Sequence, residues 1–183
     1  ERLVQKDLGN GETGIITNVD SDFNETVDST RLVQKDLGEG KTGILTEVDS
    51  NFAPTPDSER LIQVTLPNDA NGYEQTGLIT NVDSNWTETA DSEKIIQVSL
   101  PPDANGYNQT GLITGVAGDW SMTADSERLI QVELPPDGNG YDRTGIITEV
   151  TASWGASGLS ERLIQVDLPA DGNGYDQTGI ITE

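Results

Sequence analysis

Four segments of the sequence carry the residues best suited to metal chemistry. They share the pattern Asp-x-Asn-Gly-Tyr and span residues 69–73, 103–107, 137–141 and 171–175. Alternating Asp and Asn oxygens ligate Ca2+ in EF-hand loops, so these side chains are candidate ligands. The candidate metal ligands are Asp69, Asn71, Asp103, Asn105, Asp137, Asn139, Asp171 and Asn173.

The same pattern is also typical of tight turns. Asp and Asn side chains bond to their own backbone, and Gly adopts positive φ. An EF-hand needs a further oxygen ligand where this chain has Tyr, and a Glu at the twelfth position that is absent here. Turn chemistry is therefore favoured, with Ca2+ as the alternative and no other cofactor expected.

Aromatic residues recur in two places and could contact sugars. Each Asp-x-Asn-Gly-Tyr segment ends in a tyrosine, and we expect this segment to protrude because its length varies while its flanks do not. The other aromatic residues lie in segments of constant length, which favours burial in a core. The tyrosines are therefore the candidate surface contacts: Tyr73, Tyr107, Tyr141 and Tyr175.

Three sequons fit N-glycosylation, at Asn24, Asn85 and Asn108. They occupy different positions in the repeats described below, and a chain rich in Asn and Thr produces about this many by chance.

Nothing in the sequence marks a catalytic site. The chain contains no His and no Cys, which removes the commonest general base and the thiolate nucleophile. Carboxylate pairs are abundant, but none differs from its copies elsewhere in the chain. We therefore expect a protein that is not an enzyme.

These residues are positioned by a motif that occurs six times. Arg-Leu-Val-Gln-Lys-Asp-Leu at 2–8 returns near residues 31, 60, 94, 128 and 162, and each copy precedes a Thr-Gly-Ile-Ile-Thr-like segment. Both segments are rich in β-branched residues and are separated by turn residues, which predicts an antiparallel β-hairpin. If Asn10 and Gly11 form a two-residue turn, Leu8 faces Thr13 and Lys6 faces Ile15.

The hairpins are joined by linkers of constant length. Eleven residues separate the Val after each second strand from the basic residue of the next repeat, and an aromatic residue always follows that Val by four positions. We expect each ring to be buried between neighbouring units, and residues 86–90 to form a short third strand. The linker aromatics are Phe23, Phe52, Trp86, Trp120 and Trp154.

The repeats predict an all-β fold of six tandem hairpins, each 29–34 residues long. They form a single array without a separate linker domain, stacked as an open β-array or fibre segment. A closed, six-unit, propeller-like ring is the alternative; the polar first two repeats favour the open form. The repeat boundaries are 1–30, 31–59, 60–93, 94–127, 128–161 and 162–183.

The charge of the chain limits its partners. Its 32 acidic and 10 basic residues give a net charge of −22, which repels nucleic acid and anionic lipid. Apolar runs are too short to insert in a membrane. We therefore predict an extracellular or cell-surface structural or adhesive protein that associates with like repeats or subunits. The alternative is a lectin-like module that binds glycans at one shallow site per repeat.

Overall fold

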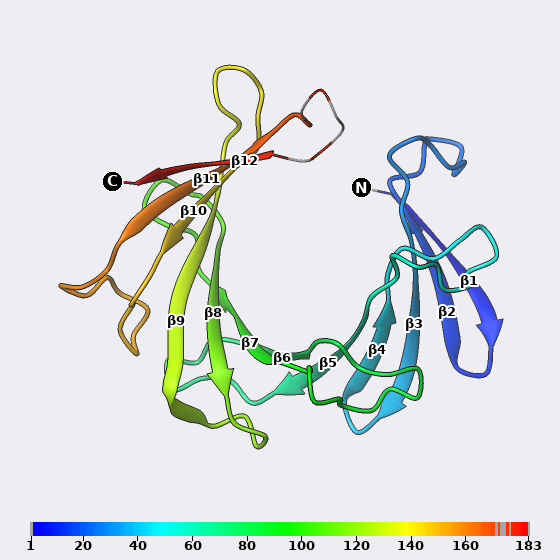
Figure 1. The fold of residues 1–183 in the computed structure, drawn as a ribbon, viewed down its shortest axis with the longest axis horizontal. Helices are drawn as coiled ribbons and strands as arrows, with labels where there is room; N and C mark the ends of the chain where they lie inside the picture. Colours follow the sequence, from blue (N-terminus) through cyan, green and yellow to red (C-terminus); the bar gives the residue numbers. More distant parts are fainter. Residues whose placement is uncertain (1, 171, 173–174, 176, 183) are drawn as a thin grey trace. The chain divides into compact units, whose positions relative to one another are not determined.

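The computed structural model describes residues 2–170, 172, 175 and 177–182. These residues form twelve β-strands and no helix, which confirms the all-β prediction. The strands lie in one open sheet in chain order, from β1 at one edge to β12 at the other (Figure 1). No helix in the described part of the chain could cross a membrane. The strands are β1 (Leu3–Gly9), β2 (Glu12–Thr17), β3 (Arg31–Gly38), β4 (Lys41–Leu45), β5 (Arg60–Leu66), β6 (Gln75–Ile79), β7 (Lys94–Leu100), β8 (Gln109–Val116), β9 (Met122–Leu134), β10 (Arg143–Ile147), β11 (Arg162–Leu168) and β12 (Gln177–Thr182).

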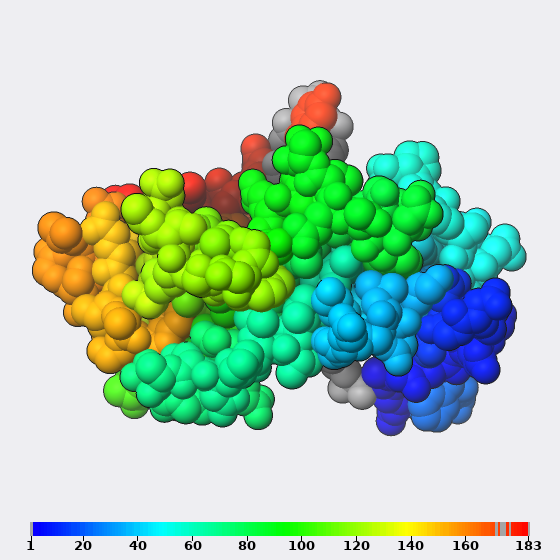
Figure 2. Space-filling model, turned by 90° about the horizontal axis from the view of Figure 1, so that it is seen from below, coloured from blue at the N-terminus to red at the C-terminus, as the bar shows by residue number. Residues whose placement is uncertain are grey.

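The chain divides into two compact units. Unit 1 consists of Glu1–Thr65 and Gly77–Lys94, and unit 2 consists of Leu66–Thr76 and Ile95–Glu183. In unit 1, the first repeat lies directly beside the second on the surface, as the adjoining dark and light blue atoms show (Figure 2).

The first hairpin contains the predicted turn but in a shifted register. Asn10 and Gly11 have φ angles of 54° and 77°, as a type I′ turn requires. A β-bulge between Asp7 and Gly9 then displaces the pairing by one residue, so that Lys6 pairs with Gly14 rather than Ile15. The same bulge occurs in the hairpin of β3 and β4. The predicted pairing was therefore wrong, because the extra residue is invisible in a simple two-residue turn.

One face of the sheet carries most of the core. In β7, Ile96 and Val98 are buried at 4% and 0% exposure, whereas Ile95 and Gln97 on the opposite face are half-buried. Val98 pairs with Gly111 of β8, and Gly111 pairs in turn with Ile130 of β9. A row of two branched residues with a glycine between them thus crosses three strands on the buried face.

The linkers are ordered by their own polar side chains. In the first, Oδ1 of Asp20 accepts hydrogen bonds from the backbone N–H groups of Asp22 and Asn24. Further on, the hydroxyl groups of Thr26 and Ser29 both donate to the carbonyl oxygen of Asn18. These bonds explain the constant linker length, because an insertion would break them.

Similar Thr or Ser pairs close the other linkers, at Thr55 and Ser58, Thr89 and Ser92, Thr123 and Ser126, and Ser157 and Ser160. The predicted third strand at 86–90 is absent, because this segment forms turn and coil instead.

Every linker aromatic has a positive φ angle. The values run from 61° at Phe52 and Trp86 to 67° at Trp120. Bulky residues rarely adopt this conformation, which costs on the order of 1–3 kcal/mol. Strain of this kind persists only where the surrounding structure holds the residue in place.

Candidate functional site

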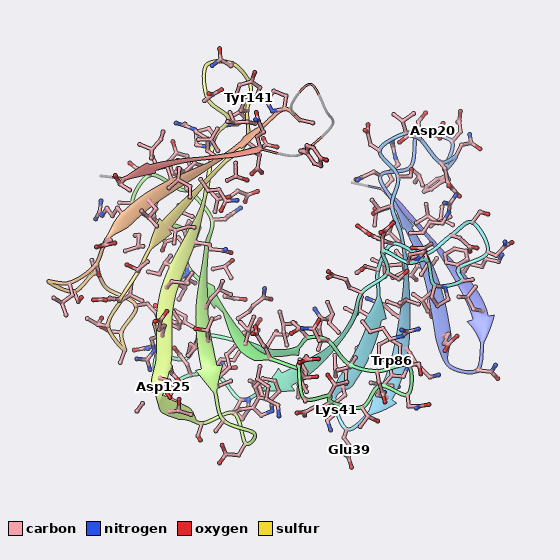
Figure 3. All side chains as sticks on the ribbon, viewed as in Figure 1. Asp20, Glu39, Lys41, Trp86, Asp125 and Tyr141 are labelled. Atoms are coloured by element: carbon pink, nitrogen blue, oxygen red, sulfur yellow. The ribbon has the colours of Figure 1, made fainter. Side chains whose placement is uncertain are left out.

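Three linker rings, those of Phe52, Trp86 and Trp154, lie on glycines of the preceding repeat. A Cβ atom on Gly14 would lie 2.5 Å from Cε1 of Phe52, and one on Gly43 would lie 2.6 Å from Cε3 of Trp86. Figure 3 shows Trp86 beside β3 and β4. Because each of these glycines lacks a side chain, the ring packs directly on the sheet. The contact therefore needs both a glycine in the strand and an aromatic residue with a positive φ in the linker.

In unit 2, the ring of Trp154 makes the same kind of contact. A Cβ on Gly111 would lie 2.5 Å from Cζ3 of Trp154, and this ring packs against the buried clusters that contain Val98 and Ile130. We call Val98, Gly111 and Ile130, together with Asp69 and Asn71, the Gly111 site. The ring of Trp154 fills this site.

The polar part of the Gly111 site comes from a loop two repeats earlier than the linker. Nε1 of Trp154 donates to Oδ2 of Asp69 at 2.9 Å, and Nδ2 of Asn71 donates to the carbonyl oxygen of Ala152 at 3.1 Å. Desolvation raises the pKa of Asp69, but bonds from the Trp154 indole and the Tyr73 amide outweigh it and hold this pKa below its usual value. The Asp69 loop therefore holds both the ring and the backbone of the linker.

A second site of the same composition lies one repeat further along unit 2. It is a pocket of about 440 Å³. We call it the Gly145 site. The residues that define it each lie 34 positions after a residue of the Gly111 site: Asp103, Asn105, Val132, Gly145 and Ile164.

No ring covers the Gly145 site among the described residues. The nearest atoms to a Cβ on Gly145 belong to Val132 and Leu134, at 3.4 Å. Ile164 is accordingly half-buried, whereas Ile130 in the equivalent position is 3% exposed. The Gly145 site is therefore open where the ring of Trp154 covers the Gly111 site.

The carboxylate at the rim suits an N–H donor. A backbone hydrogen bond from Tyr107 holds the pKa of Asp103 below its usual value, although desolvation opposes this. Asp103 is therefore charged at neutral pH, and in the equivalent Asp69 such a carboxylate accepts a bond from an indole.

The predicted metal ligands occupy turns. Oδ1 of Asp69 accepts bonds from the backbone N–H groups of Asn71 and Tyr73, and Asp103 and Asp137 make the same pair of bonds. Over the residues that the structure describes, no group of three or more acidic, His or Cys side chains is arranged to hold a metal. Asp171 and Asn173 lie outside the described residues. Ca2+ binding stays a prediction.

The predicted surface tyrosines differ in their surroundings. Tyr73 packs against the cluster of Ile96, Val98 and Ile113, and Tyr107 packs against the cluster around Ile130. Tyr141 is half-buried, and Tyr175 is 71% exposed. Glycan contact by these residues stays a prediction.

The three sequon asparagines are all exposed. Asn24 and Asn85 lie on linkers. Nδ2 of Asn108 donates to Oε2 of Glu133 at 2.9 Å.

Sequence reasoning did not identify the glycines of the Thr-Gly-Ile segments as ring contacts. The available signal was their recurrence in mid-strand, since Gly inside a strand often marks the close approach of another group. Nor did it identify the role of the long loops in holding a linker two repeats away.

No protein-family model matches this sequence, and neither a curated protein nor a solved structure matches it. The interpretation of the site therefore rests on its geometry.

Proposed function

We propose that this chain is a non-enzymatic structural or adhesive protein of the cell exterior or cell surface, built as an open array of six hairpin units. The observation that carries the proposal is the interlocking of the repeats. The linker that contains Trp154 lies on Gly111 of one repeat and is held by Asp69 of the repeat before that. Such contacts serve cohesion along an array.

The energetics of the hairpin support this proposal. An isolated two-stranded hairpin is marginally stable in water, so each unit needs the apolar contacts of its neighbours. The cluster of Val33, Leu45, Val48 and Phe52 illustrates this, because it also contacts Leu8 of the first repeat and Trp86 of a later linker. A structural protein needs this shared cohesion, because load on one unit passes to the next.

The charge fits a molecule that stays dissolved at high local density. A net charge of −22, spread over the repeats, disfavours nonspecific aggregation by electrostatic repulsion. Specific contacts must then supply any association with like subunits.

Negative-stain microscopy and a glycan array test the proposal together. The structural role predicts concentration-dependent filaments or rods and no glycan binding. Glycan binding that is lost in the Tyr107→Ala, Tyr141→Ala double variant would instead establish the lectin-like alternative. A large rise in melting temperature on adding Ca2+ would show that the array is assembled by Ca2+, whereas an unchanged melting temperature is expected from turn chemistry alone.

A further inference from the structure

Two of the linkers are closed by an ion pair between residues six positions apart. In the first linker, Nε and Nη2 of Arg31 donate to the two carboxylate oxygens of Glu25. In the third, Nζ of Lys94 donates to Oε2 of Glu88 at 2.8 Å. Each pair joins the middle of a linker to the first residue of the next strand, and so adds to the hydroxyl bonds that hold the same linker.

The fourth linker, residues 117–127, places a different acceptor at this position. The hydroxyl groups of Thr123 and Ser126 both donate to the carbonyl oxygen of Gly115, so the linker is closed as the others are. Six positions before Arg128, however, lies Met122, and Nη2 of Arg128 donates to its Sδ at 2.7 Å. A thioether sulfur is a weak acceptor, so this contact is weaker than a hydrogen bond between a guanidinium and a carboxylate.

Oxidation of Met122 would give this side chain the acceptor that the position holds elsewhere. In methionine sulfoxide the sulfur stands where Glu has Cδ, and the added oxygen stands where Glu has a carboxylate oxygen. The oxidised side chain therefore has the same reach as Glu25 and Glu88 toward the base six positions on. Arg128 suits the new oxygen, because a guanidinium stays charged and offers five N–H donors.

Met122 is accessible to an oxidant. It is 41% exposed, close to the 39% and 48% of the Glu25 and Glu88 side chains. Exposure is thus a property of this position in the repeat, including repeats within the array. Met122 and Arg128 also line one cavity of about 520 Å³, which leaves room for the added oxygen.

We infer that Met122 is a site of reversible oxidation by peroxide, and that the sulfoxide strengthens the fourth linker by accepting a hydrogen bond from Arg128. A sulfur lone pair attacks one oxygen of hydrogen peroxide, and the S–O bond forms as the O–O bond breaks. The sulfur is oxidised by two electrons, and the peroxide is reduced to water. Methionine sulfoxide reductase reverses the step.

The direction of the effect separates this site from ordinary oxidative damage. A sulfoxide formed in a core disrupts packing, because a polar group replaces an apolar one. Met122 has little buried surface to lose at 41% exposure, and it gains a stronger acceptor for a charged donor. The inference goes beyond the proposed structural role and holds whether or not that role is correct.

Hydrogen exchange before and after peroxide treatment tests the inference. Met122 is the only methionine, so a low dose adds one oxygen, which peptide mass spectrometry assigns to this residue. The amides of residues 117–127 are expected to exchange about threefold more slowly after oxidation, as one exposed hydrogen bond to a charged group predicts. Methionine sulfoxide reductase should restore the original rates. The fifth linker, residues 151–161, contains no methionine and serves as the internal control.

Three variants isolate the contact. Met122→Glu is expected to slow exchange by a similar factor without peroxide, because it restores the pair found at Glu88 and Lys94. Met122→Leu is the matched control, since it keeps an apolar side chain but should not respond to peroxide. Arg128→Ala should still be oxidised at Met122 but show no slowing, because the donor is gone. Far-UV circular dichroism and melting curves check that all three are folded.

Exchange that is unchanged or faster in the oxidised protein would overturn the inference. Slowing that persists in oxidised Arg128→Ala would do so as well, because the sulfoxide would then act through another group. If Arg128→Ala does not fold, the comparison of Met122→Glu with Met122→Leu decides: equal exchange in these two variants would show that an oxygen acceptor at this position does not hold the linker.

Discussion

The Gly111 and Gly145 sites are lined by equivalent residues, but only the Gly111 site is filled by an aromatic ring among the described residues. Both consist of a glycine between branched residues, together with an Asp and an Asn from a long loop. Trp154 fills the first, whereas the second is an open pocket. Variants of the two sites therefore separate the contribution of the ring from that of the sheet and the loop.

Removal of the ring should have the largest effect on stability. Trp154→Ala is expected to lower the free energy of unfolding by about 3 kcal/mol, because a half-buried indole is lost from two clusters. Phe23→Ala keeps the same backbone strain but removes an exposed ring, so the expected loss is within about 0.5 kcal/mol. Urea titration followed by circular dichroism measures both. Equal losses would contradict the role assigned to the Gly111 site.

Addition of a methyl group should separate the two glycines. Gly111→Ala forces the new Cβ against the indole and is expected to cost about 1–3 kcal/mol. Gly145→Ala meets only ordinary contacts at 3.4 Å and is expected to change stability by less than about 0.5 kcal/mol. The same titration checks this pair, and a costly Gly145→Ala would mean that the second site is less open than its lining indicates.

The carboxylates should differ by one hydrogen bond. Asp69→Ala and Asp103→Ala each remove the same turn, but only Asp69 also accepts the bond from Trp154. We expect Asp69→Ala to cost about 1 kcal/mol more than Asp103→Ala. A double-mutant cycle of Asp69→Ala with Trp154→Phe measures that coupling, and a coupling of zero would remove the indole bond from the account.

Acid should weaken the Gly111 site. The pKa of Asp69 lies below its ordinary value of 3.8, because hydrogen bonds to the charged form outweigh desolvation. A lowered native pKa stabilises the fold above the unfolded pKa, and this contribution is lost as the pH falls below about 4 through the native pKa. Melting temperatures between pH 7 and pH 3 should therefore fall less steeply in Asp69→Asn than in the wild type; equal slopes would contradict this.

The open site should accept a linker added from outside. A synthetic peptide of residues 148–161 is expected to bind weakly, with a Kd of about 1 mM, since most of its contact energy offsets the cost of ordering it. Nuclear magnetic resonance shifts should centre on the Gly145 amide. Gly145→Leu, or a peptide with Ala in place of Trp, should abolish them, and shifts that persist in either case would place the peptide elsewhere.

Much of the fold could be predicted because it is written in local patterns. Alternating branched residues and the Asn10-Gly11 turn predicted the strands, and a constant linker length predicted order between them. The predicted strand pairing was wrong at the bulge near Gly9, because the spacing of hydrophobic residues does not reveal an extra unpaired residue. The ring contact was not predicted, because Trp154 and Gly111 are far apart in the sequence and only the folded sheet places one over the other.

The reach of the Asp69 loop has a consequence for how the molecule would come apart. In most repeat proteins each unit contacts only its immediate neighbours, so the array can unfold from its ends one unit at a time. Here the Trp154 linker touches elements from two repeats at once. Loss of the repeat that contains Trp154 would therefore also break the hydrogen bonds to the Asp69 loop, which lies two repeats earlier. Removal of one repeat by truncation should therefore unfold about three repeats together. The size of this cooperative unit is set by the contact between the Asp69 loop and the Trp154 linker, and not by the length of one repeat.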